Sequence, residues 1–125
     1  MKESFDELYG IMRLDRRNSP WSKKDTMENR CKELASEVEE VKLAISSNDV
    51  QNLKEELGDV LLDLLFLLVI AEEKGMFTAK EVIDGPIAKL KHRKPWIFSG
   101  EKLTVEEETK RWHELKAQEK AGKKK

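Results

Sequence analysis

The feature that most restricts the fold is an apolar stretch at 60–71, VLLDLLFLLVIA, which only Asp63 interrupts. It is too short to span a bilayer, for which about 20 residues are needed. Its residues are apolar nearly all round a helix, which predicts a helix buried on nearly all sides. A chain of 125 residues would struggle to surround one helix so completely. We therefore expect a homodimer or homotetramer, in which this helix packs against its symmetry mate.

The rest of the pattern predicts an all-α protein, because prolines and glycines are few and no stretch shows strand-like alternation. Helix starts are indicated where a capping residue is followed three positions later by an acid. These starts are Ser4 with Glu7, Ser22 with Asp25, Thr78 with Glu81 and Thr104 with Glu107, and Asn48 or Asp49 supplies another cap. Gly75 and Pro95 end helices. The expected helices cover residues 3–15, 24–46, 50–74, 78–93 and 104–120.

These helices predict an oligomeric helical bundle, with four core helices plus a terminal helix, built around an antiparallel hairpin of the second and third. One domain, residues 1–120, accounts for the chain, and residues 121–125 are expected to form a disordered basic tail.

Composition narrows the classes of partner. The chain has 24 basic and 25 acidic side chains, whereas a dedicated nucleic-acid binder usually carries a basic excess. The N-terminus MKESFDELYG lacks the apolar segment of a signal peptide. The one cysteine, Cys31, cannot form an internal disulfide and is expected to be packed. We expect a soluble, cytoplasmic protein that binds neither nucleic acid nor membrane.

Two pairs of acids stand on the hairpin helices. Glu37 and Glu40 are three residues apart on the second helix, and Glu56 and Asp59 have the same spacing on the third. An i, i+3 pair projects from one face of a helix. The segment between the pairs is long enough for a turn, so the hairpin can bring four carboxylates to one point. Either pair alone is typical of a solvated helix face, which remains the alternative.

Four close carboxylates require a neutralising cation, and oxygen-only ligands suit Mg²⁺, with Mn²⁺ as its substitute. Gly58, between Glu56 and Asp59, costs helix stability of about 1 kcal/mol relative to Ala, and it would let a metal, a phosphate or a helix approach closely. Asp63 is open to three interpretations: a further ligand, a residue that supports the ligands, or a polar residue at a subunit interface.

Other site classes find no support. A di-iron bundle requires Glu-x-x-His on two helices, but Lys89 and Lys110 precede His92 and His113 by three residues. Neither histidine has a partner at zinc spacing, and no P-loop, GxSxG or GxGxxG is present.

From Met12 to Lys120 the sequence resembles the MazG-type nucleoside triphosphate pyrophosphohydrolases of the all-α NTP pyrophosphatase superfamily. SPWSKKDT at 19–26 is similar to the family's CPWD-x-x-QT, and SEVEE with ELGD matches EExxE followed by ExxD. The matching segments further on are AEEKGMF at 71–77, KLKHRKPWIF at 89–98 and WHELKAQEK at 112–120. Order and spacing together carry the resemblance.

The resemblance implies a role for several residues. It makes Glu37, Glu40, Glu56 and Asp59 the catalytic, Mg²⁺-binding carboxylates. Five further residues would bind the nucleotide. These are Lys89 and Arg93 on the triphosphate, Trp112 and Lys116 at the C-terminal end, and Trp21 beside the site. The sequence departs from the family pattern at Ser36, where glutamate is usual, at Asp25 and Asp63, where glutamine is common, and at Ser19, Lys94 and Trp96.

The function that the resemblance implies is Mg-dependent hydrolysis of an NTP or dNTP to NMP or dNMP and pyrophosphate, which clears non-standard or surplus nucleotides. The alternatives are a sister-branch pyrophosphohydrolase, dUTPase-like or phosphoribosyl-ATP type, and a non-catalytic helical interaction protein.

Overall fold

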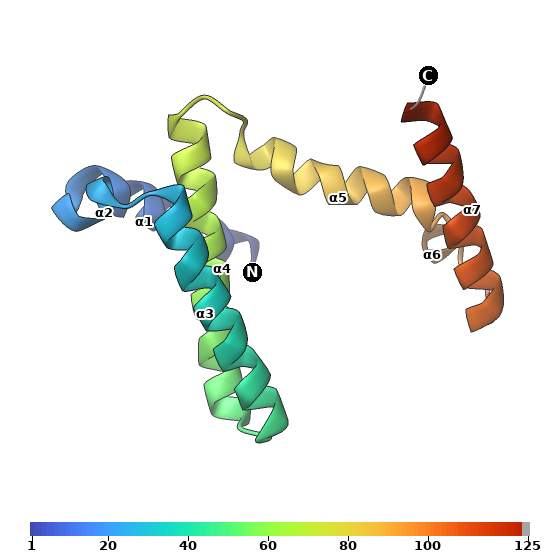
Figure 1. The fold of residues 1–125 in the computed structure, drawn as a ribbon, viewed down its shortest axis with the longest axis horizontal. Coiled ribbons are helices and arrows are strands. Elements are labelled where there is room, and N and C mark those ends of the chain that lie inside the picture. The colour runs from blue at the N-terminus through green and yellow to red at the C-terminus, as the bar shows by residue number, and fades with distance from the viewer. Residues whose placement is uncertain (124–125) are drawn as a thin grey trace. The chain divides into compact units, whose positions relative to one another are not determined.

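The computed structural model describes residues 1–123, which are almost entirely helical and contain no strand (Figure 1). The predicted all-α fold is confirmed for this range. The helices are α1 (Lys2–Asn18), α2 (Pro20–Lys24), α3 (Met27–Ser46), α4 (Val50–Glu73), α5 (Ala79–Arg93), α6 (Trp96–Ser99) and α7 (Val105–Lys123). They form two compact units, Met1–Ala79 and Lys80 onward. Of the expected tail, residues 124–125 lie outside the described range.

The first unit is built around the predicted antiparallel hairpin of α3 and α4 (Figure 1). Its turn includes Asn48, which has a positive φ of 56°, a conformation that asparagine tolerates better than most residues. Asp49 then caps α4, because its Oδ1 accepts a hydrogen bond from the Asn52 backbone N–H at 3.1 Å. This turn sets the register of the two helices that carry the predicted acids.

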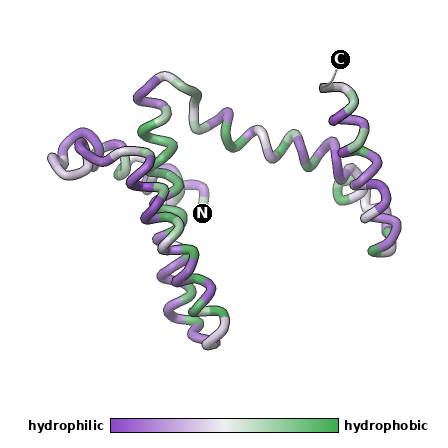
Figure 2. Tube along the Cα trace, viewed as in Figure 1, coloured by the Kyte–Doolittle hydropathy of each residue, from purple (hydrophilic) through white to green (hydrophobic). Residues whose placement is uncertain are grey.

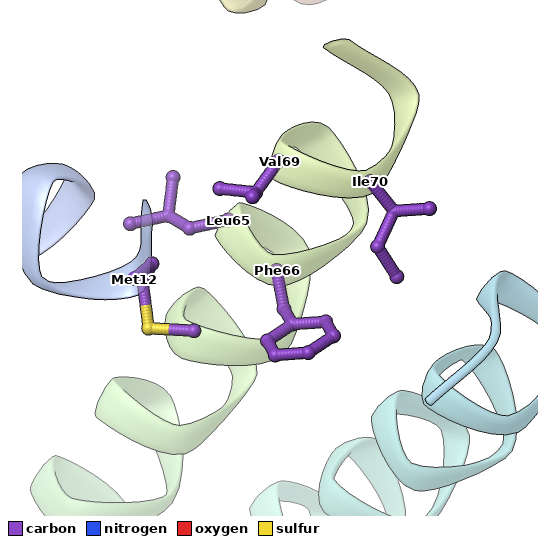
Figure 3. Packing of buried hydrophobic residues seen from close by; sticks show 5 residues of the cluster. All are labelled: Met12, Leu65, Phe66, Val69 and Ile70. Carbon is purple, nitrogen blue, oxygen red and sulfur yellow. The ribbon is translucent and has the colours of Figure 1, made fainter. Parts of the chain in front are cut away.

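The core of this unit lies between α1 and the C-terminal half of α4, where hydrophobic residues gather (Figure 2). Met12 from α1 lies beside Leu65 and Phe66 of α4, and Val69 and Ile70 of α4 belong to the same buried cluster (Figure 3). Phe66 and Ile70 are each only 1% exposed. Full burial of one such side chain contributes about 1.5–3 kcal/mol. The core therefore fixes α4, the helix that carries Glu56 and Asp59.

Polar contacts join the same two helices beside the core. The Tyr9 hydroxyl donates to Glu72 Oε1, and Arg13 donates to the same oxygen at 3.3 Å. Arg16 Nε donates to Glu73 Oε2 at 2.9 Å. Burial, together with the hydrogen bond and the charge of Glu72, raises the pKa of Tyr9 to about 12.

Two predicted helix starts in the first unit are wrong. α1 begins at Lys2, so Ser4 lies inside it and caps nothing. Ser22 also lies inside a helix, the short α2, which Ser19 caps. The N-cap of α3 is Thr26, whose side chain accepts from the Asn29 N–H at 3.1 Å. A capping motif in sequence marks a favourable position, but tertiary contacts choose among neighbouring ones.

The second unit comprises α5, α6 and α7. Its predicted capping box is confirmed, because Thr104 Oγ1 accepts from the Glu107 N–H and Glu107 Oε1 accepts from the Thr104 N–H, both at 3.2 Å. Trp96, in α6, is buried and donates from Nε1 to Glu108 Oε2 at 2.6 Å. None of the described helices combines the length and the apolar character that a membrane crossing requires.

Candidate metal centre

Three of the predicted acids come together between the hairpin helices. Glu37 of α3 and Glu56 and Asp59 of α4 each offer a carboxylate oxygen, and these oxygens lie within 4.8 Å of one another. All three residues are partly buried. The i, i+3 spacing on α4 and the register of the hairpin produce this approach.

The neighbouring acids contribute to a raised pKa of Glu37, which increases from 4.5 to about 7. A hydrogen bond with Glu56 is the largest cause, followed by burial and by the charges of Glu56, Asp59 and Asp63. Three carboxylates at this separation cannot all ionise cheaply unless a cation joins them.

The carboxylate of Glu56 indicates whether a metal ion fits the three-acid group. Its Oε2 atom is buried and has no hydrogen-bond partner among the described residues. A buried carboxylate oxygen without a hydrogen-bond partner costs free energy. That cost is removed when the oxygen binds a divalent cation as one of its ligands. The donor set consists of oxygen alone, as hard cations such as Mg²⁺ and Mn²⁺ prefer. The residues present therefore fit a divalent cation.

The other predicted members of this site lie close by without joining the group. Glu40 is exposed, one turn further along α3 than Glu37. A Cβ added at Gly58 would meet no atom within 4 Å, so nothing within this chain requires glycine there. A close approach to Gly58 stays a prediction about groups from outside the chain.

Asp63, which the sequence left open, forms a buried ion pair with Arg30. Arg30 Nη1 donates to Asp63 Oδ1 at 2.9 Å, and Nη2 donates to Asp25 Oδ2 at 2.7 Å. Burial opposes ionisation of Asp25, but hydrogen bonds from Asn29 and Arg30 lower its pKa. Trp21 is 66% exposed, and its ring centroid lies 5.5 Å from the guanidinium of Arg30.

The second unit brings together most of the predicted nucleotide-binding residues. The ring of Trp112 has the cationic groups of Arg93, Lys94 and Lys116 at 5.3, 5.6 and 5.4 Å from its centroid. Arg93 also donates to Glu119 Oε2 at 2.7 Å. Cations around one indole form a surface suited to an anion that carries an aromatic group.

Three cavities lie among these residues. Lys89 and Arg93 line one of about 460 Å³ with Ala88, His92, Glu119 and Gly122. Arg93 and Lys116 line a second, of about 330 Å³, with Ala117, Glu119 and Lys120. Trp112 itself borders a third cavity of about 250 Å³, with Lys94. Four of the five residues that the sequence assigned to the nucleotide, Lys89, Arg93, Trp112 and Lys116, thus line hollows that each contain at least one basic side chain.

Residues 25–98 match the MazG nucleotide pyrophosphohydrolase domain. The chain belongs to the MazG family. The match contains all four predicted carboxylates together with Lys89 and Arg93, whereas Trp21, Trp112 and Lys116 lie outside it.

Similar proteins agree with the MazG assignment. A nucleoside triphosphate pyrophosphohydrolase from Mycolicibacterium smegmatis is 37% identical over 94% of this chain and 37% of its own length. The nucleoside triphosphate pyrophosphohydrolase/pyrophosphatase MazG of Thermotoga maritima is 40% identical over 99% of this chain and 49% of its own length. The chain therefore spans less than half the length of these relatives.

A solved structure extends the agreement to the fold. The crystal structure of a MazG-related protein from Thermotoga maritima superposes with a TM-score of 0.84 and 38% sequence identity, over 90% of this chain and 98% of that one.

Arg30 is the residue of this region that sequence reasoning missed. The two positions at which the sequence has aspartate and the MazG pattern has glutamine, 25 and 63, share this one partner. Two aspartates at positions where the family pattern has an uncharged glutamine indicate that a nearby cation balances their charge. That reasoning could have led to Arg30. Cys31 was also misjudged, because it is exposed rather than packed.

Proposed function

We propose that the chain hydrolyses nucleoside triphosphates, NTP or dNTP, to the monophosphate and pyrophosphate with Mg²⁺ or Mn²⁺, and so clears non-standard or surplus nucleotides. The observation that carries the proposal is the group of Glu37, Glu56 and Asp59 with its unpartnered buried oxygen. The names of the MazG relatives supply the reaction.

Glu37, Glu56 and Asp59 would hold the cation. A divalent ion bound there supplies positive charge that offsets the charge of the triphosphate oxygens. Glu40 remains a fourth ligand or a base. Because it lies outside the three-acid group and is exposed, we favour Glu40 as the acceptor of a proton from the attacking water. That water would form a bond to the α-phosphorus as the bond to the bridging oxygen breaks and pyrophosphate leaves.

The second unit carries its own set of predicted nucleotide-binding residues. Lys89, Arg93 and Lys116 would offer positive charge to phosphate groups, and Trp112 would offer a ring for stacking on a base. Trp21, exposed in the first unit, is a second candidate for stacking. Stacking tolerates every base, because each has a π-face, so this proposal predicts a broad substrate range.

We also propose that the protein assembles with copies of itself. Leu57, Leu61 and Leu64 of α4 are 51%, 39% and 44% exposed in the single chain, although they belong to its most apolar helix. They recur at i, i+4 and i+7 and so form one stripe. A second copy offers the same stripe, which makes a self-complementary interface. Light scattering measures the expected dimer or tetramer, and Leu61→Arg should shift it toward monomer.

Pyrophosphate release from a panel of NTPs and dNTPs, with and without Mg²⁺, tests the function. Glu56→Gln and Asp59→Asn should each lower kcat/KM by at least about a hundredfold. The matched control is Glu55→Gln, an exposed acid on the same helix outside the group. Equal turnover in all variants would reject the site. Turnover of dUTP alone would favour the dUTPase-like branch, and no turnover of any nucleotide would favour a non-catalytic protein.

A further inference from the structure

A buried ion network borders the candidate metal centre. Arg30 is 8% exposed and lies between the carboxylates of Asp25 and Asp63. These three charged side chains are almost completely removed from water. Buried charges are tolerated only when they are paired and hydrogen-bonded, so the contacts within the network determine where each carboxylate points.

Arg30 is itself held firmly in place. Its Nε and Nη2 atoms both donate to Asp25 Oδ2, at 3.0 and 2.7 Å, and its guanidinium lies 4.0 Å from the centroid of the Phe66 ring. Asp25 is fixed in turn by the backbone N–H of Thr26 and the side chain of Asn29. These contacts hold the guanidinium in one position, from which Nη1 donates to Asp63.

Asp63 stands on the face of α4 that carries the metal-site acids. Glu56, Asp59 and Asp63 follow the spacing i, i+3 and i+7, which keeps them on one side of the helix. Asp63 is near enough to Glu37 for its charge to act there. Nevertheless the three-carboxylate group forms without it, and its Oδ1 accepts from Arg30 instead.

We propose that Arg30 is a positioning residue that keeps Asp63 out of the ligand set of the metal centre. The inference rests on the proposed metal-dependent function. A carboxylate released one turn from Asp59 would offer the cation another anionic oxygen, and affinity for a hard cation rises with the number of such ligands. Arg30 therefore controls how tightly the centre holds its ion.

Calorimetric titration with Mn²⁺, without nucleotide, tests both parts of this proposal. Asp63→Asn leaves Arg30 paired with Asp25, so the variant should fold and lose at most about fivefold in Mn²⁺ affinity. Asp59→Asn, which removes a ligand, should lose at least about fiftyfold. An Asp63→Asn variant that binds Mn²⁺ as poorly as Asp59→Asn would overturn the proposal, because Asp63 would then be a ligand.

The second part uses a double variant, Asp25→Asn/Arg30→Gln, and a triple variant that also carries Asp63→Asn. In the double variant the carboxylate of Asp63 has lost its partner, so Mn²⁺ affinity should be about tenfold higher than in the single variant Asp25→Asn, which keeps Arg30. Adding Asp63→Asn should remove that gain, and equal affinities of the double and triple variants would overturn the proposal. If circular dichroism shows the double variant unfolded, Arg30→Lys with and without Asp63→Asn replaces the pair. An ammonium keeps the charge but lacks the fork that reaches two carboxylates.

The titration separates this inference from the proposed function. Wild-type protein that shows no saturable Mn²⁺ binding would overturn the metal centre and the role of Arg30 together. Saturable binding with the predicted variant pattern, in a protein that releases no pyrophosphate, would support the role of Arg30 and reject the hydrolysis alone.

Discussion

The carboxyl groups of Glu37 and Glu56, one on each helix of the hairpin, form a hydrogen bond that raises the pKa of Glu37 to about 7. A proton on one of two adjacent carboxyl groups relieves their mutual repulsion. Protons and a divalent cation would therefore compete for these oxygens.

This competition predicts the pH dependence of stability. The folded state binds the Glu37 proton more tightly than the unfolded chain does, since the ordinary pKa is 4.5. The stabilisation is therefore complete below about pH 4.5 and is lost as the pH rises to about 7. Thermal unfolding of metal-free protein should show Tm falling over this range, and saturating Mn²⁺ should restore it above pH 7.

Glu37→Gln is the matched variant for that experiment. It removes the titrating group, so its metal-free Tm should depend less on pH between 5 and 7 than that of the wild type. A wild-type Tm that instead rises steadily through this interval would contradict the assigned contact.

The network of Arg30 predicts a non-additive effect on stability. Arg30→Met leaves the buried carboxylates of Asp25 and Asp63 without their cation, which should cost about 3–5 kcal/mol in the free energy of unfolding. The triple variant Asp25→Asn/Arg30→Met/Asp63→Asn removes all three charges and should recover most of that loss. Urea unfolding measures both variants, and a triple variant as unstable as the single one would argue against the network.

Tyr9 offers a direct spectroscopic check, because the chain contains one tyrosine. Ultraviolet titration of phenolate formation should give a pKa near 12 in the folded protein. The neutral phenol is the favoured form, so the contribution to stability is present below about pH 10 and is lost as the pH rises to about 12. In Glu72→Gln the carboxylate charge is gone, and the phenol should ionise at lower pH.

The variant Gly58→Ala tests whether a group from outside the chain approaches α4 at this position. Since nothing lies within 4 Å of an added Cβ, Gly58→Ala should stabilise the protein by about 0.5–1 kcal/mol in urea unfolding. If a phosphate or a neighbouring copy approaches the helix there, the same variant should lower kcat/KM by about tenfold. A loss of stability in the monomer would contradict the open surroundings of Gly58.

The hairpin and its acids were predictable because both depend on local periodicity. Apolar spacing gave α4 to within one residue at its C-terminal end, and the i, i+3 pairs placed Glu56 and Asp59 on one face. The two shortest helices, α2 and α6, were not predicted, since five and four residues are too few for a period to appear.

Contacts between distant residues were beyond local patterns. Arg30 and Asp63 are 33 positions apart, and Arg93 and Glu119 are 26 apart. Each pair depends on how two helices pack, and many other charged residues had equal claims as partners in the sequence. The predicted fourth acid, Glu40, shows the same limit, because periodicity placed it near Glu37 without determining the direction of its side chain.

The turn at Asn48 and the Asp49 cap fix where α4 begins, so the number of residues from that point determines which way the acids of α4 face. Each residue advances an α-helix by about 100°, so one residue inserted between Val50 and Glu56 would carry both α4 acids a quarter-turn or more away from Glu37. Surface substitutions in this segment leave that angle unchanged, whereas a single-codon insertion or deletion would separate the two halves of the centre. The spacing of the segment, more than its composition, is what the proposed chemistry must preserve.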